Sequence, residues 1–248
     1  MNRQIVIAVL AAAVLAAAGA AGWWFWPQAE VVVDPRAAAQ AAEFRQVRAR
    51  AEAGDIRAAL RLGLMYRDGE GTDPDPAAGV PWLRKAAEAG LGAAQYALGR
   101  ALEDGLGVKP DPFRAAEWYR LAATLHHDPD AELALGQLYF HGRGLAQSFG
   151  DAAEWYLRAA AQGQPLALYL VGAMYEEGWG VGRDLVQAYV WYTLSLDHLD
   201  VVKAASRRYD PKASRRKVAA QMTRRQVELA EREVARWRQR HAKQTPRP

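Results

Sequence analysis

The chain has 248 residues, with 32 lysines and arginines against 28 aspartates and glutamates, a formal net charge of +4, and no cysteine. The absence of cysteine from the sequence excludes disulfide bonds, thiolate metal sites and cysteine redox chemistry. The charge is unevenly divided: residues 1–202 hold 17 basic and 24 acidic side chains, net −7, whereas residues 203–248 hold 15 and 4, net +11. The body of the protein is therefore acidic and its tail is basic.

Residues 1–27 are predicted to form a signal anchor or transmembrane helix. Ile5–Trp26 is a run of 22 residues without a charge, and about 20 apolar residues are enough to cross a membrane. The run ends in the aromatic segment Trp23–Trp26, typical of a membrane interface, followed by Pro27. With Arg3 on the cytoplasmic side, we expect a single-pass inner-membrane protein whose remaining residues lie in a bacterial periplasm.

An alternative for the same segment is a cleaved signal peptide. Ala18-Gly19-Ala20 fits the small-x-small pattern of a cleavage site. Cleavage there would leave a soluble periplasmic protein rather than a tethered one.

Residues 28–51 are expected to be a linker followed by an N-terminal capping helix. The helical pattern covers residues 37–53 and ends at Gly54.

The next part of the chain repeats one pattern four times. Pairs of glycines separated by one residue occur at Gly69/Gly71, Gly105/Gly107, Gly142/Gly144 and Gly178/Gly180, and tryptophans follow at Trp82, Trp118, Trp155 and Trp191. Both series advance by 36, 37 and 36 residues. A fixed period of this length predicts a solenoid, because one unit cannot bury its apolar face without its neighbours.

The second unit illustrates the helix pair expected in each repeat. Residues 90–103 carry an apolar stripe at helical spacing. Gly99 lies inside this helix, which predicts a very close approach of the paired helix. Gly105 is expected to end the helix, and Asp111 to cap a second helix over residues 113–123. Its large Trp118 is expected to fill space against the next repeat.

The recurring A-x3-LG-x-L/M-Y-x2-G-x-G-x7-A-x2-W-x3-A-A pattern resembles the Sel-one-like repeat, a relative of the tetratricopeptide repeat. The resemblance covers residues 52–196 as four units of about 52–87, 88–123, 124–160 and 161–196. It implies an all-α, right-handed superhelical solenoid whose concave side is lined by the first helices. It also implies an adaptor role in protein complexes, without catalysis.

The sequence contains no motif that would make the protein an enzyme. His126 and His127 lie near two aspartates, but adjacent histidines do not easily face one metal ion and no third histidine is nearby. The glycine pairs lack the preceding strand that a dinucleotide site requires. We therefore expect no catalytic residues, no metal and no cofactor.

Positions that vary between the repeats while their neighbours stay constant are candidates for a partner-binding surface. On the first helices they include Arg61, Arg67, Arg100 and Gln137. His141 and Glu177 are further candidates, because with Asp68 and Asp104 they fill one position that could form a row of ligand-binding side chains. His141 occupies the place of an acid in the other three units, and those acids are expected to pair with arginines or accept loop hydrogen bonds. The alternative is that these positions are ordinary solvated surface.

Residues 197–248 are predicted to form basic capping helices. Thr223 and Gln226 form a capping box, and the stripe Val227, Ala230, Val234 and Trp237 is expected to cover the last repeat. Arg225, Arg232, Arg236 and Arg240 remain on the other face, where an anionic surface or polymer is a possible partner and nucleic acid is not expected.

Together these features favour a membrane-tethered, exported scaffold that binds unidentified proteins on its concave face. The alternative is a protein that binds or modifies peptidoglycan.

Overall fold

The computed structural model describes residues 34–244. The predicted anchor at residues 1–27, its alternative as a cleaved signal and the start of the linker lie outside these residues. Among the helices of the described part, none has the length and apolar character needed to cross a membrane.

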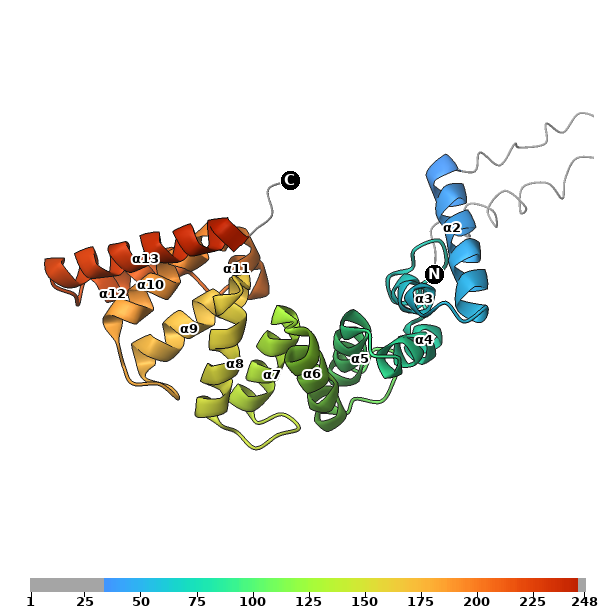
Figure 1. Ribbon diagram of the computed structural model, residues 1–248, viewed down its shortest axis with the longest axis horizontal. Helices are drawn as coiled ribbons and strands as arrows, with labels where there is room; N and C mark the ends of the chain where they lie inside the picture. The colour runs from blue at the N-terminus through green and yellow to red at the C-terminus, as the bar shows by residue number, and fades with distance from the viewer. Residues whose placement is uncertain (1–33, 245–248) are drawn as a thin grey trace, which may run out of the picture. The chain divides into compact units, whose positions relative to one another are not determined.

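The all-α prediction is confirmed for the described residues, which contain helices and no strands. After α2 (Pro35–Glu52) come four helix pairs. The first helices are α3 (Ile56–Asp68), α5 (Gly92–Asp104), α7 (Pro129–His141) and α9 (Pro165–Glu177); the second helices are α4 (Pro76–Glu88), α6 (Pro112–His126), α8 (Phe149–Ala161) and α10 (Leu185–Ser195). Each second helix packs against its own first helix, and α4, α6 and α8 also pack against the first helix of the next pair (Figure 1).

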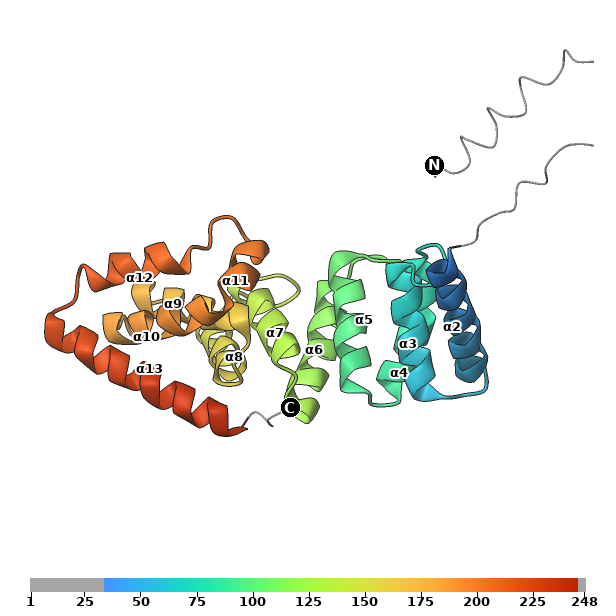
Figure 2. The ribbon, with the colours of Figure 1, turned by 90° about the horizontal axis from the view of Figure 1, so that it is seen from above.

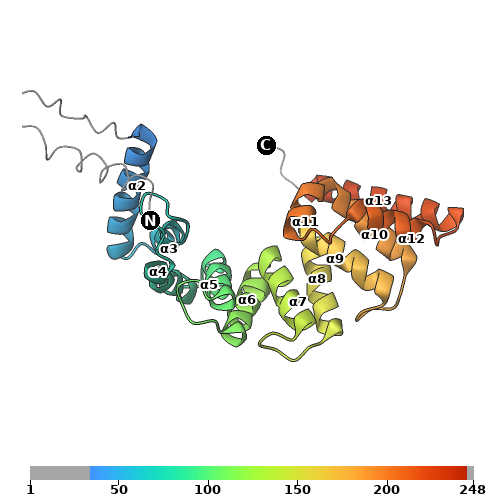
Figure 3. The same cartoon turned by 180° about the vertical axis from the view of Figure 1, so that it is seen from behind.

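The tail adds a 3-10 turn (Leu196–His198) and the helices α11 (Leu199–Ala205), α12 (Pro211–Ala219) and α13 (Arg224–Gln244). Of these, α11 packs beside α9, whereas α12 and α13 pack against α10 (Figure 3). The last repeat is therefore covered by three separate segments of the tail.

The close approach predicted at Gly99 is confirmed. A Cβ atom built on Gly99 would lie 2.6 Å from the ring of Tyr119, which is completely buried in the facing helix α6. Gly136 has the same relation to Tyr156, at 2.6 Å. Tyrosines thus fill the space that the mid-helix glycines leave in the second, third and fourth repeats, and Leu83 fills the space opposite Gly63 in the first.

The predicted caps are confirmed as well. Gly105 ends α5 in a left-handed conformation, with φ 71°, and the Asp111 side chain accepts from the backbone N–H of Arg114 at 3.0 Å. The second glycine, Gly107, also has a positive φ. A Cβ atom on Gly107 would collide with the backbone of Pro76 and Ala77 at the start of α4, so this glycine allows the loop to touch the preceding repeat.

The repeated tryptophans pack against the core without entering its interior. Trp82, Trp118, Trp155 and Trp191 are half-buried at the edge of the core, whereas alanines, leucines and the tyrosines of the second helices form its interior. Trp155 is partly covered by the guanidinium of Arg158, 4.5 Å from its ring centre. The rings are too large for spaces that alanines keep narrow, so they close the outside of these spaces.

The predicted capping role of the last helix is confirmed. In α13, Ala230 and Val234 are buried and the helix lies along α10 (Figure 2). Thr223 and Gln226 make the capping box, with the Thr223 N–H donating to Gln226 Oε1 at 2.8 Å. Tyr189 of α10 donates to Glu231 of α13 at 2.6 Å.

Candidate functional site

Two pockets lie next to each other on the outward surface of α5, α7 and α9, which we call the first-helix face. Gln137 of α7 lines both. The aromatic pocket has a volume of about 220 Å³ and is lined by five aromatic rings, those of Phe140, Tyr156, Tyr169, Trp179 and Tyr209. The charged pocket has a volume of about 430 Å³ and is lined by Arg100, Glu103, Asp104, Asp130 and Arg143.

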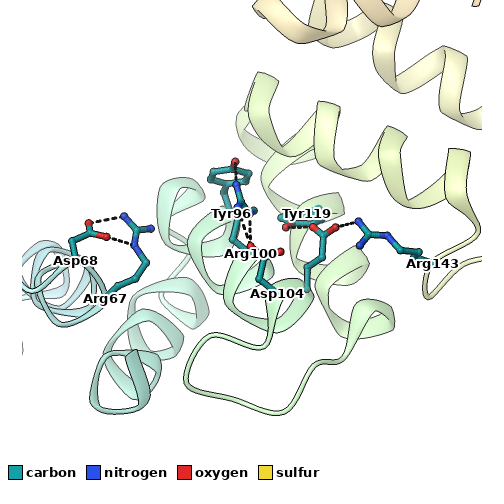
Figure 4. Close-up of polar contacts among 8 residues, drawn as sticks. Arg67, Asp68, Tyr96, Arg100, Asp104, Tyr119 and Arg143 are labelled. Carbon is teal, nitrogen blue, oxygen red and sulfur yellow. Dashed lines mark hydrogen bonds and ion pairs between the residues drawn. The ribbon is translucent and has the colours of Figure 1, made fainter. Parts of the chain in front are cut away.

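The charged pocket is organised around Glu103, whose side chain is only 7% exposed. Its carboxylate accepts a hydrogen bond from the Tyr119 hydroxyl at 2.7 Å and pairs with the guanidinium of Arg143 (Figure 4). Because Arg143 comes from the loop after α7, this contact connects two repeats. Burial, with the nearby Glu103 charge, raises the pKa of Tyr119, so the phenol stays protonated and acts as the donor.

Arg100 occupies the outer part of the charged pocket. Its guanidinium pairs with Asp104 at 2.9 Å and donates to the Tyr96 hydroxyl at 3.4 Å (Figure 4). Both arginines of the pocket therefore have carboxylate partners. Asp130, by contrast, is exposed and has no ion-pair partner among the described residues; it accepts from the Gln164 side-chain amide at 3.2 Å.

The aromatic pocket is walled by rings from two repeats and from the tail. Phe140 of α7 lies 5.1 Å from the Phe149 ring centre and 5.5 Å from that of Trp179. Tyr169 of α9 packs against Tyr209, from the segment between α11 and α12, with 4.9 Å between ring centres. The tail thus contributes one wall of a pocket that belongs mainly to the third and fourth repeats.

Three of the six candidate residues come together at these pockets. Arg100 lines the charged pocket, His141 the aromatic pocket and Gln137 both. They come from two different first helices, and the structure brings them to one continuous surface.

The other three candidates line neither pocket. Arg61 pairs with Glu43 of α2 at 3.0 Å and with Glu70 at 2.6 Å. Arg67 pairs with its neighbour Asp68 at 2.7 Å, as Figure 4 shows. Glu177 lies 3.8 Å from Lys217 of α12. These contacts confirm the expectation that the acids at the ends of the first helices pair with cations, with a lysine in the case of Glu177.

Sequence comparison of the repeats missed the residues that give the site its chemistry: Asp130, Arg143, Tyr156, Tyr169, Trp179 and Tyr209. One signal was present, since Phe140 stands where the second and fourth repeats have Glu103 and Glu176. The contribution of Tyr209 had no signal, because that residue lies outside the repeats.

The pockets hold groups suited to binding rather than a catalytic constellation. Within residues 34–244, no group of three or more histidine, aspartate or glutamate side chains is placed to bind a metal ion. The available chemistry is aromatic contact, charge pairing and hydrogen bonding by Gln137 and the phenols.

Four segments of the chain match the Sel1 repeat: residues 56–91, 92–127, 129–164 and 165–198, together more than half of the sequence. Over 66 residues, or 27% of this chain, it is 39% identical to the ERAD-associated E3 ubiquitin-protein ligase component HRD3A of Arabidopsis thaliana and 38% identical to HRD3B. The chain spans only about a tenth of the length of these relatives.

A solved structure shows the same architecture. The crystal structure of a Sel1 repeat protein from Oxalobacter formigenes superposes with a TM-score of 0.57 and 31% sequence identity, over 64% of this chain and 46% of that one.

Proposed function

This chain belongs to the Sel1 repeat family, whose members serve as protein–protein interaction scaffolds, and we propose that it binds a protein partner across the aromatic and charged pockets. The observation that carries the proposal is the continuity of the two pockets through Gln137. An apolar pocket beside a charged one offers a partner both an anchoring contact and orientation.

Catalysis is not part of this proposal. In the charged pocket, Asp104 is paired with Arg100, and Glu103 with Arg143 and Tyr119, which leaves Asp130 as the one carboxylate of this pocket without a cation partner among residues 34–244. A pair of carboxylates flanking one bond is what glycoside hydrolysis requires. Nothing in the pockets specifically favours the peptidoglycan alternative.

Site-specific photo-crosslinking in cells of the source organism tests the proposal. A benzoylphenylalanine probe at Gln137 lies where the pockets meet, and a matched probe at Glu154 lies on a second helix, with its side chain 61% exposed. We expect a discrete protein adduct from Gln137 that is absent from Glu154. Adducts with glycan alone, or identical adducts from both positions, would contradict the proposal.

We further propose that residues 1–27 hold the protein at a bacterial inner membrane with the repeats in the periplasm. The uncharged run Ile5–Trp26 and its terminal aromatic segment support this location. The exposed arginines of α13, at positions 225, 232, 236 and 240, support contact with an anionic surface. Removal of the segment by signal cleavage would leave the repeats in the same compartment but untethered.

Fractionation of cells that express the full chain decides between these arrangements. We expect the protein to stay with the membrane after alkaline carbonate extraction, to keep Met1-proximal residues in its N-terminal sequence, and to be degraded by protease added to spheroplasts. A mature chain that begins after Ala20 would replace the anchor with the cleaved signal, and protection from protease would contradict export.

A further inference from the structure

Equivalent positions in the second, third and fourth repeats differ in one contact. In the second repeat Tyr119 donates to Glu103 at 2.7 Å, and in the fourth Tyr192 donates to Glu176 at 2.7 Å. Both carboxylates also pair with a cation from the following segment, Arg143 and Lys217 respectively. The second and fourth repeats therefore share this contact, whereas the first has Leu83 and Arg67 at the two positions.

The third repeat keeps the tyrosine and loses its acceptor. Tyr156 packs on Gly136 as its counterparts pack on their glycines, but the acceptor position is held by Phe140. Tyr156 is only 2% exposed, and its hydroxyl has no hydrogen-bond partner among the described residues. Burial raises the pKa of Tyr156, so the phenol remains a neutral donor.

This unpartnered phenol lines the aromatic pocket. The hydroxyl oxygen is not among the fully buried polar atoms without a partner, so it is open to the pocket and can donate to an acceptor that a ligand supplies. The pocket is large enough for one apolar side chain, and the surrounding rings offer faces to it rather than charges. A peptide side chain entering here brings its own backbone carbonyl, which is the kind of acceptor that Tyr156 lacks.

The neighbouring charged pocket indicates which charge the ligand carries. Its two arginines are each paired with a carboxylate, whereas Asp130 has no cation opposite it in residues 34–244. Around this pocket, the repeats at 52–196 carry 12 basic and 19 acidic side chains, net −7. A ligand that carries a lysine or arginine close to its apolar side chain therefore complements the charge of this surface.

We propose that the aromatic pocket is a specificity pocket for a polypeptide segment that carries an aromatic or long aliphatic side chain close to a lysine or arginine. The apolar side chain enters between Phe140, Trp179 and Tyr209, a peptide acceptor binds the Tyr156 hydroxyl, and the basic side chain faces Asp130. The inference rests on the proposed scaffold function and adds the chemistry of the segment that is bound.

The test uses the immobilised full chain, in mild detergent, to select binders from a displayed library of short random peptides. Selected peptides are synthesised and their dissociation constants measured by fluorescence polarisation. We expect the selected sequences to share an apolar side chain with a nearby lysine or arginine. Tyr156→Phe should weaken the binding of these peptides about tenfold, the size expected for one buried hydrogen bond. Ala173→Phe, which fills the pocket, should weaken their binding further.

Matched variants separate binding from stability. Tyr119→Phe makes the same substitution in the second repeat, where the hydroxyl is bonded to Glu103; it should lower resistance to urea and leave the affinity unchanged. Tyr156→Phe should show the reverse pattern, because it removes a hydroxyl that has no partner in the free protein. Asp130→Asn should weaken the peptides about threefold and reduce the dependence of their affinity on salt.

The outcomes distinguish the inference from the function on which it rests. If Gln137→Arg abolishes peptide binding while Tyr156→Phe and Ala173→Phe leave it unchanged, the first-helix face is a docking surface but the aromatic pocket does not select the ligand. If Tyr156→Phe lowers stability as much as Tyr119→Phe, the hydroxyl has an internal partner and the inference is wrong. If no peptide binds in the micromolar range, the inference fails, whereas the scaffold proposal is decided separately by crosslinking from Gln137.

Discussion

Single residues decide which repeat carries the binding chemistry. Phe140 occupies a position that is a glutamate in two other repeats. With phenylalanine there, the Tyr–Glu hydrogen bond is absent, and Tyr156 lines an open pocket instead. The rings of Trp179 and Phe149 are 41% and 37% exposed beside it and pack against Phe140. Function is therefore expected where the repeat pattern is broken.

Glu132 offers a residue-scale prediction about pH. Its side chain lies in α7, the residue is 3% exposed, and it accepts from Gln162 Nε2 at 2.7 Å. Burial raises the pKa of Glu132, although the Gln162 hydrogen bond and the charge of Arg158 act in the opposite direction. Since the folded pKa lies above the unfolded value, the charged carboxylate reduces stability at neutral pH, and stability is regained as the pH falls through the raised pKa.

We expect Glu132→Gln to unfold at a higher urea concentration than the wild type at pH 7.5, because an amide still accepts from Gln162 without a buried charge. The difference in urea midpoint between the variant and the wild type should shrink as the pH is lowered toward the ordinary pKa of glutamate. Urea titrations at several pH values would measure this change. Glu154→Gln, at an exposed position, should change stability by less than about 1 kcal/mol. A variant less stable than the wild type at pH 7.5 would show that the charge is needed.

At the scale of elements, the helix pairs of the second, third and fourth repeats place a glycine opposite a tyrosine ring. In the second repeat, the Gly99 backbone of α5 approaches Tyr119 of α6 too closely for a Cβ atom, and Tyr119 is held in place by its hydrogen bond to Glu103. The ring has no room to withdraw, because it is completely buried. The glycine is thus a packing residue, despite its low helix propensity.

We expect Gly99→Ala to destabilise the protein by about 1–3 kcal/mol, since overpacking of α5 against α6 outweighs the gain of about 1 kcal/mol in helix propensity. Gly182→Ala is the matched control, because a Cβ atom there would meet nothing within 4 Å. Its stability should stay within about 0.5 kcal/mol of the wild type. Chemical denaturation measures both, and a Gly99→Ala variant as stable as the control would refute the packing argument.

At the scale of the whole molecule, each repeat packs against the segments that flank it along the chain. The buried residues fall into two clusters that meet at α7 and α8, and the second includes Val234 of α13. Each repeat makes its main contacts with adjacent repeats, with α2 at one end or with the tail at the other, so stability is expected to be a sum of local and nearest-neighbour contributions. Arg238 adds an ion pair to Asp197 at 2.8 Å, which connects α13 to the end of the last repeat.

We expect Val234→Asp to open the C-terminal repeats while the N-terminal ones stay folded, because it places a charge at a position that is 1% exposed. Amide hydrogen exchange followed by mass spectrometry should show lost protection in α9 and α10 and retained protection in α3 and α4. Arg232→Asp, on the exposed side of α13, is the control and should leave the exchange pattern unchanged. Uniform loss of protection would show that the protein unfolds as one unit.

The sequence by itself determined the helical repeat, the caps and the close helix pairs. These features depend on local chemistry: the φ of Gly105, the capping oxygen of Asp111 and the space left by Gly99 act on residues within one unit. It also identified Arg100, Gln137 and His141 as surface positions, because they vary while their neighbours do not.

Only the tertiary structure decided which of these positions form one site. The pocket joins Phe140 to Tyr169 from the next repeat and to Tyr209 from the tail, and their spacing depends on how helices and loops far apart in sequence pack. Arg61 illustrates the same point, since its partner Glu43 belongs to a helix outside the repeats. The periodicity of the sequence indicates which side of a helix a residue occupies. Which groups lie opposite that side depends on how the helices and loops pack in the folded protein.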